Sequence, residues 1–183
     1  RDGTNVRRNW DGLRTTWRRG RWRVDALAMQ LVDVEMKGIF NDTSDDDRVL
    51  GGLYATADLG QQGLDLYWLY AGFDDRLTIE GVADQRRQSL GARYFGERGP
   101  VFWNWEAIVQ AGEHGDQDIE AWTVATNTGY RFEVPWSPEL MLSMNVSSGD
   151  SERDDGKLQT FDALYPRGNY ISELAQFGPV NLY

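Results

Sequence analysis

The sequence predicts an all-β fold, an antiparallel up-and-down β-barrel that crosses a membrane with its strands. Hydrophobic and polar residues alternate with a period of two over most of the chain, which is typical of half-buried strands. The connections between these segments alternate between short and long, as they do in outer-membrane barrels. The chain has 183 residues, no Cys and no apolar run of about 18 residues, so we expect neither disulfides nor a transmembrane helix.

Eight strands are expected, all longer than the average of about 5 to 6 residues in soluble sheets. They cover residues 6–17, 22–34, 50–60, 64–70, 87–97, 101–111, 119–133 and 139–147. Strands of about 10 to 13 residues suit a membrane crossing tilted by roughly 45°. Many aromatic residues also fall near the strand ends, where a membrane interface favours them.

The two faces of each strand differ as the wall of a membrane channel requires. The side chains expected to face lipid include Trp103, Trp105, Val109, Leu140, Leu142 and Val146. Those expected to face inward include Asn104, Glu106, Gln110, Ser143 and Asn145. A soluble barrel or sandwich could show the same alternation, but charged residues at mid-strand suit a water-filled lumen better than a core.

Turn residues then divide the connections into two kinds. Tight turns with Gly or Pro are expected at residues 18–20, 61–63, 98–100 and 134–138. Longer polar loops are expected at residues 36–49, 74–86, 113–118 and 150–178. The single His, His114, falls in the third loop, where we expect a solvated side chain rather than a metal ligand. Calcium binding at the acidic loops stays an open alternative.

The last of these segments, residues 150–178, is too long for a simple connection. It carries apolar anchors at Phe161, Leu164 and Tyr165, which a purely solvated loop would not need. We expect a long extracellular loop that folds over the mouth of the barrel or into the lumen. The alternative is that it packs on neighbouring loops as a structural cover.

Charged residues on the polar faces are the candidate functional residues. The side chains expected in the lumen are Arg8, Arg14, Arg23, Asp25, Asp58, Arg93, Glu106 and Arg131. Of the 19 basic residues only Lys37 and Lys157 are not Arg, and Arg suits bidentate contacts with carboxylates. Rows of Arg lower the barrier for carboxylate-bearing polymers, and acidic residues among them keep binding weak enough for release. The alternative is that each Arg pairs with a carboxylate and only rigidifies the barrel.

Several short strings along the chain are also familiar. They are residues 9–14 (NWDGLR), 52–55 (GLYA), 106–112 (EAIVQAG), 118–121 (DIEA), 129–132 (GYRF), 148–150 (SGD) and 160–166 (TFDALYP). Their order and spacing resemble those of the alginate-export family of bacterial outer-membrane proteins over nearly the whole chain. The resemblance implies a monomeric barrel of about eighteen strands, a size within the range of outer-membrane barrels, with an Arg-rich lumen through which a polyuronate passes outward. By motif position, the role of an arginine that lines the lumen carries over from the family to Arg14, Arg93 and Arg131.

Residues 1–183 are therefore expected to form one domain, a contiguous part of a larger barrel in the bacterial outer membrane. The expected function is a channel for an alginate-like polyuronate or a related small anionic solute. The expected partners are outer-membrane lipid or lipopolysaccharide and that anionic cargo. A net charge of −10 argues against nucleic acid. The resemblance implies a monomer, and we expect no cofactor, metal or catalytic residues. Glu106 and Glu120 would form a glycosidase pair only in some strand registers.

Two other interpretations stay open at this point. Eight strands can close into a small barrel filled by its own side chains, which would serve as a membrane anchor or adhesin. A soluble β module could instead bind sugar through Trp103, Trp105 and Trp122, because Trp faces stack well on sugar rings.

Overall fold

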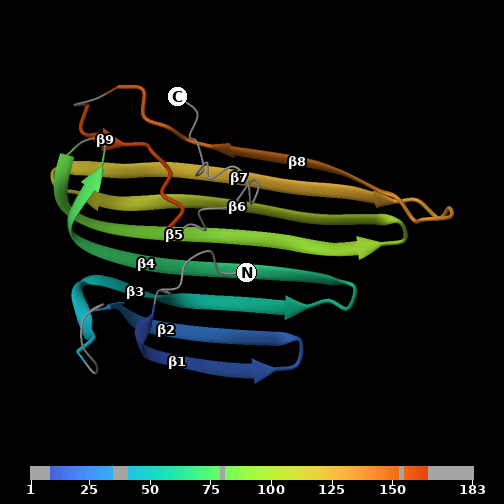
Figure 1. Cartoon of the computed structure of the whole chain (residues 1–183), viewed down its shortest axis with the longest axis horizontal. Coiled ribbons are helices and arrows are strands. Elements are labelled where there is room, and N and C mark those ends of the chain that lie inside the picture. Colours follow the sequence, from blue (N-terminus) through green and yellow to red (C-terminus); the bar gives the residue numbers. More distant parts are fainter. Residues whose placement is uncertain (1–8, 35–40, 79–80, 153–154, 165–183) are drawn as a thin grey trace.

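The computed structural model describes residues 9–34, 41–78, 81–152 and 155–164 as one all-β sheet. The strands are β1 (Trp10–Arg19), β2 (Trp22–Asp33), β3 (Thr43–Asp58), β4 (Gln62–Thr78), β5 (Gly81–Arg98), β6 (Val101–His114), β7 (Gln117–Arg131), β8 (Glu139–Ser147) and β9 (Lys157–Leu158). The first eight lie side by side in chain order, each antiparallel to the next (Figure 1). All eight expected strands are therefore confirmed. The short β9, which pairs in parallel with β7, was not expected.

The register of the sheet separates an apolar face from a polar face. Directly opposed residues on β3 to β7 form one row of large apolar side chains, Leu53, Trp68, Leu90, Val109 and Trp122. Each is between 42% and 61% exposed, although a soluble protein would bury such a row. On the opposite face, the positions that alternate with the apolar ones along these strands carry Tyr, Asp, Arg and Gln side chains, and several of these are buried.

The expected sidedness holds on β6, where Trp105 and Val109 are exposed and Gln110 is buried. Trp103, Asn104 and Glu106 are intermediate. On β8, Leu140, Leu142, Ser143 and Asn145 are all exposed, because this strand lies at the edge of the described sheet. Its register nevertheless places Leu142 opposite Thr128, which lies opposite Trp103 on the apolar face.

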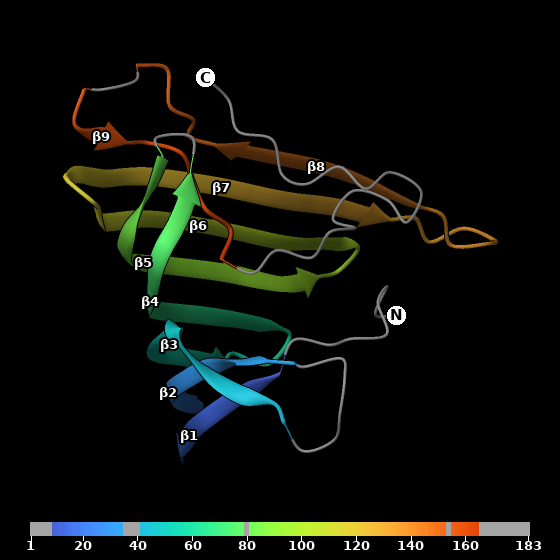
Figure 2. The same cartoon turned by 60° about the vertical axis from the view of Figure 1, so that its left-hand side comes forward.

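The sheet curls strongly, and within the described residues it does not close (Figure 2). Strands β1 and β8 form its two edges, and no pairing joins them in the described part of the chain. The small closed barrel of eight strands requires that pairing, so the structure does not support this interpretation. None of the described residues form a helix long and apolar enough to cross a membrane.

One end of the sheet, the turn rim, holds the connections β1–β2, β3–β4, β5–β6 and β7–β8. The first three turns contain Gly20, Gly60 and Gly99, each with a φ between 58° and 86°. Glycine adopts this left-handed backbone with little strain. The turn expected at residues 61–63 lies instead at residues 59–61, because Gly60 supplies the left-handed position and Gly63 belongs to β4.

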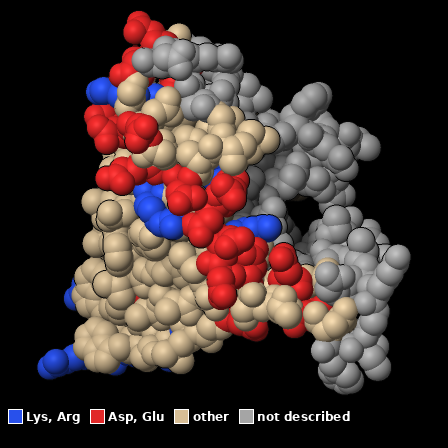
Figure 3. All heavy atoms as spheres, turned by 90° about the vertical axis from the view of Figure 1, so that its left-hand side faces the viewer, with Lys and Arg blue, Asp and Glu red and all other residues tan. Residues whose placement is uncertain are grey.

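The opposite end, the loop rim, differs from expectation. Residues 74–86 are not a loop, since β4 and β5 continue as a hairpin to Thr78 and Gly81. Residues 113–118 are not a loop either, since only Gly115 and Asp116 separate β6 from β7. Consecutive polar residues in both segments hide the strand period, although Leu77 lies opposite Val82 in the first of them, and the backbones stay paired. Acidic side chains gather across this rim with basic ones among them (Figure 3).

Candidate functional site

The structure brings seven of the eight candidate residues onto the polar face of the sheet. Asp25 lies opposite Tyr54 and Tyr54 opposite Tyr67, while Arg93 lies opposite both Asp65 and Glu106. The candidates that share this face by strand register are Arg14, Arg23, Asp25, Asp58, Arg93, Glu106 and Arg131. Arg8 lies outside the described residues.

A first cluster surrounds Asp25 on β2. Its carboxylate accepts a hydrogen bond from Arg14 Nε at 3.2 Å and from the Thr16 hydroxyl, both on β1. Arg14 Nη2 and Arg23 Nη2 lie 3.1 Å and 2.8 Å from the other carboxylate oxygen. One buried acid thus holds two arginines from neighbouring strands.

A second cluster surrounds Arg93 on β5. Arg93 Nε donates to Asn104 Oδ1 at 2.7 Å, and Nη1 lies 3.3 Å from Asp65 Oδ2. The Tyr54 hydroxyl donates to the same Asp65 oxygen at 2.9 Å. The guanidinium therefore bridges β4 and β6 across the polar face.

A stacked pair of tyrosines links this cluster to Glu106. The rings of Tyr54 and Tyr67 lie 5.2 Å apart and nearly parallel, and the Tyr67 hydroxyl donates to Glu106 Oε1 at 2.6 Å. Glu106 is thus held by a neutral donor, while the carboxylate that pairs with Arg93 is Asp65.

The remaining two candidates lie near the turn rim. Arg131 Nε bonds Glu139 Oε1 at 2.7 Å, and Nη1 lies 3.6 Å from Glu97 Oε2. Asp58 accepts the backbone N–H of Gly60 at 2.9 Å and so caps the β3–β4 turn. The structure assigns Asp58 a turn-forming contact rather than a contact with the arginine clusters.

The clusters are layered, with acids beneath and arginines above. The side chains of Asp25 and Asp65 are 9% and 5% exposed, whereas those of Arg14, Arg23 and Arg93 are 50%, 41% and 34% exposed. The carboxylates therefore lie against the sheet, and the guanidinium groups form the accessible surface. Such a surface offers N–H donors to carboxylates while the fixed charges beneath balance it.

Sequence reasoning missed a second polar group near the loop rim. Residues 157–162, here called the strap, run from β9 across the polar face of β7 and β6 toward β5 (Figure 2). The strap contacts Arg87 and Gln110, which are buried, as is Gln85 two positions before Arg87 on the same face of β5. Arg76 on β4 pairs with Asp162 of the strap at 2.8 Å. Arg76 lies in a segment that was expected to be a loop, so the sequence pattern did not indicate that it belongs to the polar face of a strand.

His114 also differs from expectation. It is the last residue of β6 and is buried, with Nε2 2.9 Å from the Thr78 hydroxyl, rather than solvated in a loop. Within the described ranges, no three His, Cys, Asp or Glu side chains are grouped so that they could hold a metal ion.

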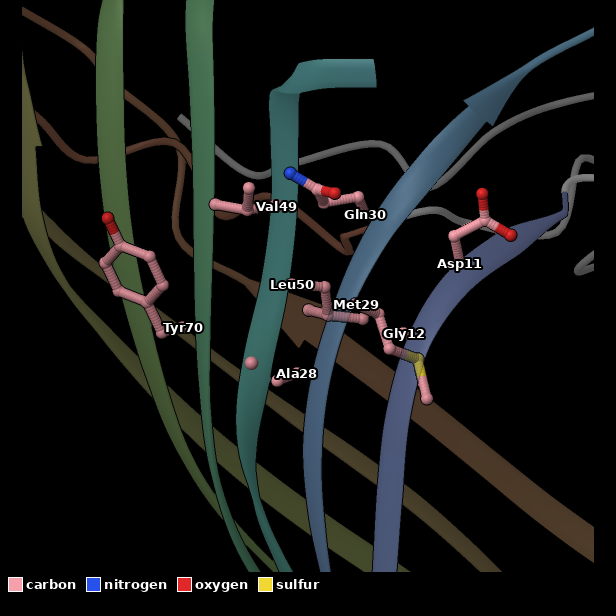
Figure 4. A pocket seen from close by; sticks show the side chains of 9 residues that line it. Asp11, Gly12, Ala28, Met29, Gln30, Val49, Leu50 and Tyr70 are labelled. Atoms are coloured by element: carbon pink, nitrogen blue, oxygen red, sulfur yellow. The ribbon is translucent and has the colours of Figure 1, made fainter. Parts of the chain in front are cut away.

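A shallow hollow of about 430 Å³ crosses β1 to β4 (Figure 4). It is lined by Asp11, Gly12, Ala28, Met29, Gln30, Val49, Leu50, Gly51 and Tyr70. It exists because Ala28 and Gly51 stand directly opposite one another and leave the space beside Tyr70 unfilled. By register these three residues belong to the apolar face, so the hollow is separate from the arginine clusters.

Comparison with known proteins gives one finding on this chain. A family model described as alginate export matches residues 1–183. Neither the curated proteins nor the solved structures contain a match.

Proposed function

Since the chain belongs to the alginate export family, whose members are β-barrel channels of the outer membrane that export polysaccharide, we propose that its polar face lines the lumen and that its arginines guide an anionic polysaccharide. The family is one of transport channels and not of enzymes. Three features go beyond the family assignment: which face lines the lumen, which residues contact the cargo, and that the cargo is negatively charged.

The apolar face supports this assignment of inside and outside. A continuous row of exposed Leu, Trp and Val side chains across five strands is costly in water but favourable against acyl chains. In this arrangement Trp105 and Trp122 contact lipid or lipopolysaccharide rather than serving as sugar platforms of a soluble module.

Aromatic side chains near the turn rim fit the same arrangement. The rings of Tyr94, Trp103 and Trp105 cluster with centroids 5.5 to 6.3 Å apart, and Tyr130 packs edge-on against Phe132. Aromatic girdles of this kind mark the interface between acyl chains and water. The turn rim then faces the periplasm and the loop rim faces outward. Of the loop expected at residues 150–178, only residues 150–152 and 155–164 are among the described residues.

The observation that carries the proposal is the layering of the arginine clusters. Because Asp25 and Asp65 lie beneath Arg14, Arg23 and Arg93, a passing polymer meets guanidinium groups first. The buried acids weaken each binding event, so a uronate carboxylate is attracted without being trapped. The proposed cargo is accordingly a polyuronate or a related small anionic solute, carried by a monomer.

The test is conductance of the full-length protein that contains this chain in planar bilayers. We expect an anion-preferring current that an oligouronate reduces and that a neutral oligosaccharide of equal length leaves unchanged. A folded preparation that does not conduct would overturn the assignment of the lumen. Equal block by both oligosaccharides would overturn the role of charge.

A further inference from the structure

The strap holds a carboxylate of the chain itself against the polar face. Asp162 Oδ2 lies 2.8 Å from Arg76 Nη2. The backbone N–H of Asp162 donates to Gln110 Oε1 at 3.0 Å, and its carbonyl accepts from Gln110 Nε2 at 2.7 Å. A single residue of the strap is thus held through its charge and through both of its backbone polar groups.

A buried arginine lies beside the strap, and within the described residues its hydrogen-bond partners are neutral oxygens alone. Arg87 is 1% exposed, and its Nη1 donates to Gln110 Oε1 at 2.6 Å and to the Thr160 carbonyl at 3.4 Å. Burial disfavours the charge of Arg87, and among the described carboxylates that of Asp162 favours it. Because burying a cation is costly without an anion nearby, Asp162 is the group that compensates Arg87 as well as Arg76.

The site also has polar capacity that the strap leaves unused. Arg87 Nε and both side-chain amide atoms of the fully buried Gln85 have no hydrogen-bond partner within the part of the chain that the structure describes. Buried polar atoms usually find partners, so these atoms offer further hydrogen bonds to a ligand that replaces the strap. A carboxylate flanked by hydroxyl groups has this chemistry.

We propose that Arg76, Arg87, Gln85 and Gln110 form a carboxylate-binding site on the lumen face and that Asp162 occupies it until a uronate of the cargo displaces the strap. The proposal rests on the proposed function and names a site and a regulation within it. Arg76 is directed to the site by Phe73, because its guanidinium carbon lies 4.3 Å from the centre of that ring. The strap crosses the face that lines the lumen, so displacement widens the passage.

The other contacts of the strap determine which part moves. Lys157 Nζ pairs with Glu120 at 2.7 Å, and this bond raises the pKa of Lys157 above its usual value. The Gln159 carbonyl accepts from the Ser148 hydroxyl at 2.7 Å, and its N–H donates to Asp150 at 3.1 Å. These anchors do not involve the carboxylate site. The Phe161 N–H also donates to the Ser148 carbonyl at 3.1 Å. Loss of the Asp162 contacts therefore releases the end of the strap that follows Phe161 and leaves β9 paired.

The experiment is amide hydrogen exchange of the full chain in detergent micelles, with tetragalacturonate as the probe and maltotetraose as the neutral control. In the wild-type protein we expect tetragalacturonate to accelerate exchange of the Asp162 amide at least tenfold, since its bond to Gln110 is lost, and maltotetraose to have no effect. Asp162→Asn should exchange rapidly without any sugar and should not respond further. Asp155→Asn, which changes an exposed acid that caps the amide of Lys157, is the matched control and should behave as wild type.

Wild-type exchange that is unchanged at a tetragalacturonate concentration that reduces the current would overturn this site and leave the proposed function standing. If tetragalacturonate accelerates exchange in a protein that does not conduct, the result would support the carboxylate site and overturn the proposed transport function. The wild-type titration decides the question even if Asp162→Asn folds poorly. Slow, wild-type-like exchange in a folded Asp162→Asn protein would also count against the site.

Discussion

Arg93 lies over the ring of Phe95, with its guanidinium carbon 4.4 Å from the ring centre. The ring itself lies flat on Gly63 of the neighbouring strand, where an added Cβ would come within 2.4 Å of it. Phe102 lies on Gly129 in the same way, with Arg131 5.6 Å above its ring centre. A glycine on one strand thus allows an aromatic ring to lie flat, and the ring in turn positions an arginine on the polar face.

The first prediction follows from this stacking. Gly63→Ala should lift the ring of Phe95 and tilt Arg93, and should destabilise the protein by about 1–3 kcal/mol through overpacking. Unfolding in urea from lipid vesicles measures the stability, and reversal potentials measure the expected loss of anion preference. Gly51→Ala is the control, because a Cβ there meets only the Leu27 carbonyl oxygen at 3.4 Å. Equal effects of the two substitutions would contradict the positioning role of Gly63.

The second prediction concerns the layered charges around Asp25. Arg23→Gln should lower the anion preference, because it removes an accessible positive charge from the polar face that we propose lines the lumen. Asp25→Asn should raise it, because the negative charge beneath Arg14 and Arg23 is lost. Reversal potentials in a salt gradient measure both. Shifts in the same direction, or no shift in either variant, would show that these side chains serve only as structural ion pairs.

A third prediction separates the two faces by their tolerance of charge. Val109→Lys places a charge in the middle of the exposed apolar row, and should cost about 2–4 kcal/mol if that row lies near the midplane of the bilayer. Asn127→Lys places the same charge on the polar face, directly opposite Asn104, and should cost little. Unfolding free energies of the two variants in the same vesicles make the comparison. A similar cost for both would contradict the assignment of lipid and lumen faces.

The fourth prediction concerns the segment that includes the strap. Deleting residues 153–166 from the full-length channel should raise its single-channel conductance, because the described part of this segment crosses the polar face, which we propose lines the lumen. The alternative, in which the segment only covers neighbouring loops, predicts an unchanged current. Planar bilayer recordings of both proteins distinguish the two outcomes.

Alternation of apolar and polar residues was sufficient to predict the eight long strands and their order. This pattern predicts strands where one face is apolar and the other is polar, as on β6. A register shift of one residue there would place Gln110 on the apolar face in the position of Val109. For the same reason seven candidate residues could be assigned to one face without any knowledge of their partners. The family resemblance read from short strings is confirmed by the match over residues 1–183.

The same pattern failed at the loop rim. Consecutive polar residues at 74–76 and 84–86 interrupt the period of two, although Leu77 and Val82 form an apolar pair between them. A segment that looked like a loop is therefore a paired hairpin. His114 looked solvated for this reason, yet its place at the end of β6 buries it. Backbone pairing is nearly independent of side-chain polarity, and sequence patterns detect only the side chains.

The sequence by itself determined the strands, the tight turns and the division into two faces, because each depends on residues close together in the chain. The tertiary structure alone decided which acid lies beneath which arginine and where the strap crosses the sheet. Asp65 meets Arg93 across 28 positions, and Gln110 meets Asp162 across 52. Such contacts depend on strand register and on the curl of the whole sheet, which local patterns do not specify.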